Sequence, residues 1–368
     1  MSYTSKKLVI DARMIHASGI GTVLQNLIPV LKNKFNIILL GNPSELNKFD
    51  WSQNIEIVSF KSPVYSIKEQ LKLPFIVPYC DIFLSPHFNV PVFPIKAKQR
   101  AVIIHDLYHM ASTTLNLLHR IYAKILLTAA VKRSDKIITV SNFTLSELRK
   151  YFNLGNKIVH KISLGVDQSK FNNLPITDEL ESEVRVKYNL PPQFILYVGN
   201  VKPHKNLIGL VKALPLVAGN IRLPLVIVGK KEGFLNADEQ LFRFIEQHCL
   251  SDHIHFTGFV DDKHLPAVYK LAKVFIFPSL YEGYGLPPLE AMASGCPTIV
   301  SNAASIPEVC KDASLYVDAT QPKQLAEAIE FVIENNDLRL DLTVKGEELI
   351  ESYSWTKSGN MLNSILQS

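Results

Sequence analysis

The stretch that decides the fold is Val274-Phe-Ile-Phe-Pro-Ser-Leu-Tyr-Glu-Gly-Tyr-Gly-Leu-Pro-Pro-Leu-Glu-Ala-Met-Ala-Ser-Gly-Cys-Pro297. It opens with four apolar residues, Val274–Phe277, a run that is typical of a buried strand. A turn with Gly283 and Gly285 follows and leads into a helix that we predict for Pro288–Ser294. A buried strand that runs through a turn into a helix is the repeating unit of a parallel sheet.

The same alternation of short apolar runs and amphipathic stretches extends in both directions along the chain. In the second half it predicts strands at 194–198, 225–228, 254–257, 274–277, 298–301 and 314–317, and helices at 206–216, 237–248, 262–272, 288–294, 324–334 and 338–351. In the first half it predicts strands at 7–11, 37–40, 55–59, 82–85, 101–104, 136–140 and 158–161, and helices at 21–32, 115–133 and 144–151. The fold class is therefore α/β, with helices on both faces of parallel sheets.

The length of 368 residues and a break in this pattern predict two domains. We assign residues 1–167 to an N-terminal Rossmann-like domain and residues 193–352 to a C-terminal one. Residues 168–192 are polar and mixed, contain one short helical run, end in Pro191-Pro192, and are predicted to be a linker. A last helix within 353–368 is expected to return towards the N-terminal domain. Two doubly wound domains in tandem predict a cleft between facing sheets, because such sheets bind ligands outside their carboxyl ends.

Composition excludes several classes of protein. The 39 Lys and Arg residues barely exceed the 34 Asp and Glu residues, which is too weak a bias to predict nucleic-acid binding. The four cysteines are widely spaced and form no CxxC pair, so we expect reduced thiols, as in a cytosolic protein. Residues 1–13 lack the apolar region of a signal peptide, and no run approaches the length of a membrane span.

The glycine turn carries the residues with the clearest chemistry. Gly283 and Gly285 allow the backbone N–H groups to approach a ligand closely, and the helix that follows favours an anion at its N-terminus. Glu282 and Glu290 flank the turn, and carboxylates accept hydrogen bonds from vicinal hydroxyls. Taken alone, this pattern is also compatible with a plain strand-to-helix turn whose glutamates are solvated.

The run Glu282-Gly-Tyr-Gly-Leu-Pro-Pro-Leu-Glu290 resembles the E-x7-E signature of glycosyltransferase family 4, whose members are retaining enzymes of the GT-B fold. The resemblance covers nearly the whole chain. Further matching segments are Ile10-Asp-Ala-Arg13 with Ser18-Gly-Ile-Gly21, Ile104-His-Asp-Leu107, Val140-Ser-Asn-Phe143, Gly165-Val-Asp167, Tyr197-Val-Gly-Asn-Val-Lys-Pro-His-Lys-Asn206, and Ser301-Asn with Ile306-Pro-Glu308.

The resemblance implies a role for each matching position. Lys205 would pair with the donor diphosphate, Glu282 would contact the transferred sugar, and Glu290 would bind the ribose hydroxyls. The remaining implied contacts to sugar or phosphate come from the backbone at Gly283, Tyr284, Gly285 and Leu286 in the second domain, and at Gly19 and Gly21 in the first. The Gly19-Ile-Gly21 pair lacks the third glycine of the dinucleotide fingerprint, which argues against an NAD-dependent oxidoreductase.

The sequence departs from the family pattern near Lys205. Many members carry an arginine where this chain has Asn200, and another where it has His204, so neutralisation of the diphosphate would rest more heavily on Lys205, with Lys202 and His204 as further candidates. His105 follows an apolar strand, and the resemblance places it near the anomeric carbon of the sugar. Asp106 either orients this imidazole or caps the turn.

For the chemistry, the resemblance implies a sugar nucleotide as donor and a glycan or lipid-linked glycan as acceptor, with no cofactor. No Asp-x-Asp metal motif follows a strand, and Lys205 with the helix N-terminus can replace a metal, so we predict that no divalent ion is required. Asp261-Asp262 is only a near match to a metal motif. GDP-mannose is the first choice of donor, since the motifs look most like those of bacterial polysaccharide mannosyltransferases; UDP-glucose, UDP-GlcNAc and dTDP-rhamnose stay open. The alternatives are a sugar-phosphate synthase or phosphorylase and a non-catalytic sugar-nucleotide-binding protein.

The expected location is the cytoplasm, with peripheral contact to the inner face of the cell membrane left open. Residues 66–78 and 115–133 mix apolar and basic side chains. Such segments either meet a lipid-linked acceptor at a membrane surface or are core helices with exposed lysines. The sequence does not indicate an oligomeric state.

Overall fold

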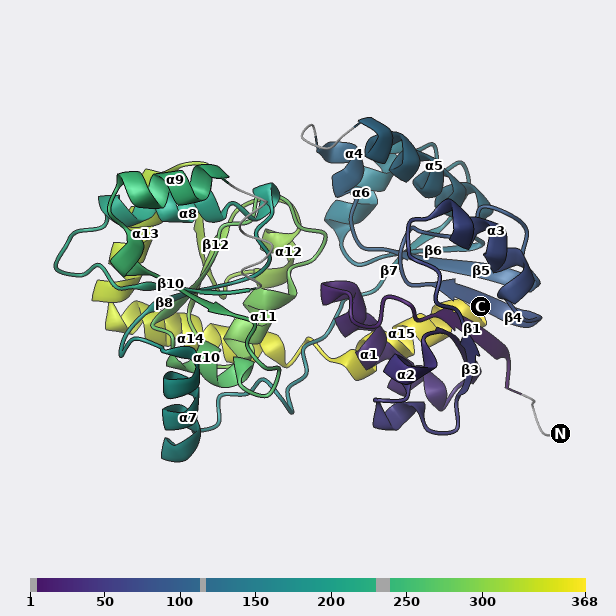
Figure 1. Ribbon diagram of the computed structural model, residues 1–368, viewed down its shortest axis with the longest axis horizontal. Helices are drawn as coiled ribbons and strands as arrows, with labels where there is room; N and C mark the ends of the chain where they lie inside the picture. The colour runs from purple at the N-terminus through teal and green to yellow at the C-terminus, as the bar shows by residue number, and fades with distance from the viewer. Residues whose placement is uncertain (1–4, 113–116, 230–238) are drawn as a thin grey trace. The chain divides into compact units, whose positions relative to one another are not determined.

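The computed structural model describes residues 5–112, 117–229 and 239–368, and it divides into two compact units (Figure 1). The first unit comprises residues up to Gly165 together with Trp355–Ser368, and the second comprises Val166–Ser354. Each unit is a parallel sheet covered by helices, which confirms the predicted α/β class with two doubly wound domains.

The first unit contains a seven-stranded sheet in the order β3-β2-β1-β4-β5-β6-β7. Its strands are β1 (Lys7–Asp11), β2 (Asn36–Gly41), β3 (Glu56–Ser59), β4 (Cys80–Ser85), β5 (Ala97–Ile104), β6 (Lys136–Thr139) and β7 (Val159–Lys161). Its helices are α1 (Ser18–Lys32), α2 (Pro43–Leu46), α3 (Ile67–Ile76), α4 (Tyr108–Ala111), α5 (Leu117–Arg133), α6 (Asn142–Tyr151) and α15 (Trp355–Gln367). In Figure 1, α3 and α5 lie on one side of these strands, and α1 and α15 lie on the other.

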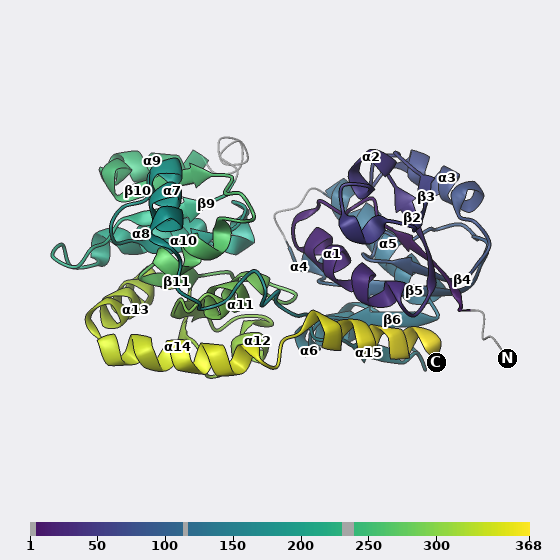
Figure 2. The same ribbon diagram turned by 90° about the horizontal axis from the view of Figure 1, so that it is seen from below.

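The second unit contains a six-stranded sheet in the order β10-β9-β8-β11-β12-β13. Its strands are β8 (Ile195–Val198), β9 (Leu225–Val228), β10 (Ile254–Gly258), β11 (Val274–Phe277), β12 (Thr298–Ser301) and β13 (Leu315–Val317). Its helices are α7 (Asp178–Tyr188), α8 (Leu207–Ala213), α9 (Glu239–Gln247), α10 (Leu265–Leu271), α11 (Leu286–Ala293), α12 (Ile306–Cys310), α13 (Pro322–Glu334) and α14 (Asn336–Ile350). Figure 2 shows α13 and α14 side by side along one edge of this unit.

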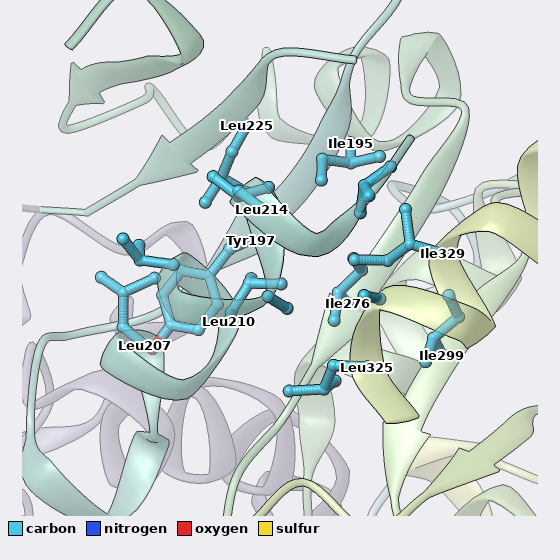
Figure 3. Packing of buried hydrophobic residues seen from close by; sticks show 14 of the residues in the cluster. Ile195, Tyr197, Leu207, Leu210, Leu214, Leu225, Ile276, Ile299, Leu325 and Ile329 are labelled. Atoms are coloured by element: carbon cyan, nitrogen blue, oxygen red, sulfur yellow. The ribbon is translucent and has the colours of Figure 1, made fainter. Parts of the chain in front are cut away.

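The core of the second unit forms where the aliphatic residues of the strands meet α8 and α13. Figure 3 shows Tyr197 beside Leu207 and Leu210, and all three side chains are almost fully buried. Burial of this many aliphatic side chains is the main favourable contribution to folding. The core therefore fixes the strands whose ends carry the predicted site residues.

Several segments differ from the sequence prediction. Residues 168–192, predicted to be a linker, belong to the second unit, and the short helical run expected within them is α7. Thr177 caps this helix by accepting a hydrogen bond from the N–H of Leu180, and its first turn is acidic, so a helix forms in a segment whose polarity resembles that of a linker. Helix α1 begins at Ser18 rather than at Gly21. The predicted helix 237–248 is seen as α9, and its first residues lie outside the described part of the chain.

Candidate functional site

The centre of the second unit brings two of the predicted segments together. Strands β8 and β11 are neighbours, and from this pair the chain winds outward in opposite directions to the two edges of the sheet. This is the switch point of a doubly wound sheet, outside which ligands bind. The loops that follow the two strands are linked, because the N–H of Leu280 donates to the carbonyl of His204 over 2.7 Å.

Lys205 and Glu282 form an ion pair across this junction. The hydroxyl of Ser279 donates to the same carboxylate oxygen, Oε1, over 2.6 Å, and Nζ of Lys205 lies 5.4 Å from the centroid of the Phe277 ring. The two charged side chains are only 19% and 12% exposed. A partly buried ammonium group is a strong binding site for an anion, but here one carboxylate already compensates its charge.

The loop from Glu282 to Leu286 has a fixed conformation. Gly285 adopts φ 106°, a value that a side chain would strain. Oγ of Ser305 lies 2.9 Å from the carbonyl oxygen of Glu282 and 2.8 Å from that of Tyr284, so its single hydrogen is shared between them. Tyr284 is buried, with its ring edge-on to Tyr353 at 6.4 Å.

Two prolines reduce the number of backbone N–H groups that this loop can offer to a ligand. Pro287 and Pro288 occupy the first turn of α11 and have no N–H to donate. Among the described residues, the N–H groups of Gly285 and Leu286 have no hydrogen-bond partner. These two donors, at the N-terminus of a helix and one loop away from Lys205, can bind an anionic or hydroxyl oxygen.

Glu290, on α11, is half-buried within the second unit. Its Oε2 accepts a hydrogen bond from the hydroxyl of Tyr269 over 3.1 Å. Burial is the largest influence on this carboxyl and raises its pKa, against the effects of the Tyr269 hydrogen bond and of the charge of Lys170. A half-buried carboxylate with one hydroxyl partner has acceptor capacity left for the hydroxyls of a ligand.

The predicted residues Gly19, Gly21, His105 and Asp106 belong to the first unit and are described within it. The predicted helix 21–32 began at Gly21 and left Gly19 in front of it, whereas the structure places both glycines in the first turn of α1. A Cβ atom on Gly21 would lie 2.5 Å from the carbonyl oxygen of Ile15, so this glycine is required for packing. Gly19 is exposed, and a Cβ atom there would meet nothing within 4 Å, so its backbone is accessible to a ligand.

His105 follows β5 and is half-buried. Its Nε2 lies 2.9 Å from the carbonyl oxygen of Pro86, which can only accept, so Nε2 carries the proton. Burial is the main cause that lowers the pKa of His105. The neutral ring thus presents Nδ1 as a hydrogen-bond acceptor. Asp106 caps a turn instead of orienting the ring: its Oδ1 accepts from the N–H of Tyr108 over 2.9 Å.

Three further features bear on the site. The side chain of Asn200, at the position of the family arginine, is exposed and forms no hydrogen bond within the described residues.

Sequence reasoning missed Ser279 and Ser305, although the spacing of Ser279, directly after a strand end and three residues before Glu282, was visible. It also missed a buried network in which Arg13 pairs with Asp11 at 2.6 Å and with Glu69 at 2.5 Å.

The described residues contain neither a candidate metal site nor a helix that could span a membrane. No group of three or more His, Cys, Asp or Glu side chains in the described ranges could hold a metal ion. None of the helices seen in those ranges has the length and apolar character needed to cross a bilayer. All four cysteines are free, three of them buried.

Comparison with known proteins places these features in context. Residues 180–349 match the family model described as "Glycosyl transferases group 1". O-antigen chain mannosyltransferase B of Escherichia coli is 30% identical over 74% of this chain and 71% of its own length. The serotype-specific mannosyltransferase WbdA of Escherichia coli is also 30% identical, over 63% of this chain but only 29% of its own length, so the match covers a part of a longer protein.

Among solved structures, HepE of Anabaena in complex with UDP and glucose superposes with a TM-score of 0.80. The superposition covers 99% of this chain and 100% of HepE, at 15% sequence identity. At this identity the likeness shows that the two proteins share a fold.

Proposed function

This chain belongs to the glycosyl transferases group 1 family, with the GT-B fold, and we propose that it transfers a hexose from a sugar nucleotide to a glycan or lipid-linked glycan. The observation that carries the proposal is the junction at the ends of β8 and β11. There, Lys205, Glu282 and the N–H groups of Gly285 and Leu286 offer a cation, a carboxylate and two donors within one pair of linked loops. Such a set matches a diphosphate joined to a sugar.

In the proposed complex, Lys205 binds the diphosphate and Glu282 turns to a hydroxyl of the sugar. The loop N–H groups bind oxygen atoms of the phosphate or sugar, and Glu290 binds the ribose hydroxyls. The bond from the anomeric carbon to the diphosphate oxygen breaks as negative charge develops on the leaving group, and Lys205 stabilises that charge. The acceptor oxygen forms the new bond on the same face of the ring, and its proton passes to the leaving diphosphate.

GDP-mannose is the proposed donor, and surface polysaccharide synthesis is the proposed role. Both rest on the names of the relatives, two of which are mannosyltransferases at 30% identity, one for O-antigen chains. UDP- and dTDP-sugars are the donors to test against it. We also propose that no divalent metal is required, because Lys205 and the helix N-terminus supply the positive charge that a metal would contribute.

Thermal stabilisation by a panel of nucleotides and sugar nucleotides tests the donor. We expect GDP and GDP-mannose to raise Tm, and we expect Lys205→Ala and Glu290→Ala to abolish the shift. Lys323→Ala, which changes an exposed lysine on α13, is the matched control and should retain it. A well-folded protein that no nucleotide stabilises would contradict the transferase proposal.

The product tests the reaction. The glycosidic bond formed should keep the anomeric configuration of the donor, as NMR of the product would show, and turnover should persist in EDTA. Inversion of configuration would refute the retaining mechanism, and loss of activity in EDTA that Mg²⁺ or Mn²⁺ restores would refute metal independence.

A further inference from the structure

Helices α3 and α5 of the first unit expose an unusual number of large apolar side chains. On α3, Phe75 is 84% and Ile67 75% exposed, and on α5, Leu118 is 73% and Leu117 66% exposed. The other exposed apolar residues of the two helices are Leu71, Ile121 and Ile125. Apolar side chains gathered in this way usually mark an interaction surface.

The strand registers place both helices on the same face of the sheet. Residues that pair in a parallel sheet point to the same side, as do residues two positions apart on one strand. Val9 pairs with Phe83, Phe83 pairs with Arg100, and Val102, two positions further along β5, pairs with Ile137. These side chains therefore share one face of the sheet.

Each helix packs against a different part of this face. Leu73 of α3 lies in the core cluster with Val9 and Phe83, and Leu127 of α5 lies in the cluster with Val102 and Ile137. The two helices are also near each other. Burial is the main cause that raises the pKa of Tyr122 on α5, and the charge of Glu69 on α3 adds to this rise. Their outer sides thus belong to one surface, and Figure 1 shows both on the same side of the strands.

The charged residues of this surface are all basic. Helix α3 exposes Lys68 and Lys72, and α5 exposes Lys124, Lys132 and Arg133. Across these two helices, all of whose residues are described, the only carboxylate is Glu69, which is buried and paired with Arg13. Within the described parts of the chain, Lys68, Lys72 and Lys124 form no ion pair.

Exposed apolar side chains together with basic ones favour one kind of binding partner for this surface. Apolar side chains interleaved with lysines, without acidic residues, match the interface of a bilayer with anionic headgroups. A second copy of the chain would bring lysines against lysines, which is unfavourable. We propose that the exposed faces of α3 and α5 form a docking surface for an anionic membrane, on which the helices lie without crossing the bilayer. This proposal does not rest on the transferase activity.

Vesicle flotation with the full chain tests the surface. We expect binding to vesicles of phosphatidylcholine that contain phosphatidylglycerol, little binding to phosphatidylcholine alone, and weaker binding as salt is raised. Replacing both Lys68 and Lys72 with glutamine should weaken binding about 25-fold, since each basic residue contributes roughly fivefold. Phe75→Ser should weaken it about tenfold.

The controls are Lys323→Gln and Leu340→Ser, which change an exposed lysine and an exposed leucine of the second unit. Both should bind vesicles like the unchanged protein, and thermal melting should show that every variant is folded. Absence of vesicle binding, or equal binding to neutral and anionic vesicles, would overturn the proposal. So would a dimer in solution that Phe75→Ser dissociates, because the apolar residues would then be buried between two copies.

Discussion

Lys205 and Glu282 form an ion pair with each other. A diphosphate must therefore displace the carboxylate from the ammonium group, while Ser279 remains available to hold the carboxylate. The ion pair keeps both side chains at the junction of the two loops. Because the carboxylate already neutralises the ammonium group, Lys205 binds an added anion less tightly than an unpaired lysine would.

The variant Glu282→Gln separates the two proposed roles of this side chain, which are to pair with Lys205 and to contact the transferred sugar. The amide keeps a partner for Ser279 but cannot neutralise Lys205, so the affinity for free GDP should rise about fivefold. The rate of transfer should fall about a hundredfold, because the variant lacks a charged contact to the reacting sugar. Calorimetry with GDP and turnover measurements check both effects, with Glu327→Gln on the exposed side of α13 as the control. Weaker GDP binding in Glu282→Gln would show that the carboxylate does not compete for Lys205.

Glu290 illustrates a conflict between stability and binding. Burial raises its pKa above the ordinary value of 4.5, so folding disfavours the charged form. The folded protein binds this proton more tightly than the unfolded chain. The contribution of Glu290 to stability is consequently most favourable at low pH and is lost as pH rises through the raised pKa.

Glu290→Gln should thus raise the Tm of the ligand-free protein at pH 7 by about 2 °C, and the gain should shrink as the pH falls towards 4.5. The same variant should bind nucleotide about tenfold more weakly, since it loses a charged acceptor for the ribose hydroxyls. Melting curves across this pH range and nucleotide titrations measure the two effects. Glu334→Gln, at an exposed position, should change neither. A gain in Tm that grows on acidification would contradict the pKa argument.

At the scale of elements, the first turn of α1 depends on one of its two glycines. Gly21 packs against the carbonyl of Ile15, which also accepts a hydrogen bond from Nε2 of Gln25 over 2.7 Å. Gly19 faces open space. Two glycines that look alike in the sequence therefore have different roles.

Gly21→Ala should destabilise the protein by about 1–3 kcal/mol, because its Cβ atom would displace backbone. Gly19→Ala is the matched control, and it should be neutral or stabilising by up to about 1 kcal/mol, as expected for a glycine replaced within a helix. Denaturant unfolding monitored by circular dichroism compares the two. Equal stability of the two variants would refute the packing role of Gly21.

The accuracy of the sequence prediction varied with the kind of element. Short β-branched runs such as Leu225–Val228 gave strand bounds that the structure reproduces, because local pattern and burial agree there. The start of α1 was misplaced, since glycines disfavour a helix and only the contact with Ile15 explains why Gly21 lies in one. Helix α7 was predicted only as a short helical run without bounds, although Thr177 and the acids after it are an N-terminal signal.

Contacts between distant residues could not be predicted from local patterns. The pairing of Arg13 with Glu69 joins the loop after β1 to α3, and the capping box of α3, from Ser66 to Glu69, gave no sign that Glu69 would also bind an arginine. The E-x7-E spacing located Glu282 and Glu290, but their partners Lys205 and Tyr269 depend on how β8 and α10 pack.

At the scale of the whole molecule, the chain passes between the two units twice, near residues 165 and 355. Helix α15 completes the first unit by packing on α1, where Gly359 allows close approach to Val30. Leu362, on the same helix, is fully buried, and the neighbouring Met361 is 44% exposed.

Leu362→Ala should destabilise the first unit by about 2–5 kcal/mol, since it opens a cavity in a packed interface. Nucleotide binding by the second unit should keep its affinity at temperatures where both units are folded. Hydrogen exchange measured by mass spectrometry would locate the loss of protection in α1 and the sheet it covers. Met361→Ala is the control and should stay within about 0.5 kcal/mol of the unchanged protein. Loss of protection confined to the second unit would refute this assignment of α15.

The position of α15 has a consequence for biosynthesis. During translation the second unit is complete in sequence before the helix that finishes the first has left the ribosome. The nascent chain must therefore hold an unfinished N-terminal sheet, with the α15-facing side of α1 uncovered, while the whole of the second unit is made. Folding of the first unit therefore cannot be completed before α15 has been synthesised, and a premature stop codon anywhere before α15 would leave α1 without its last packing partner.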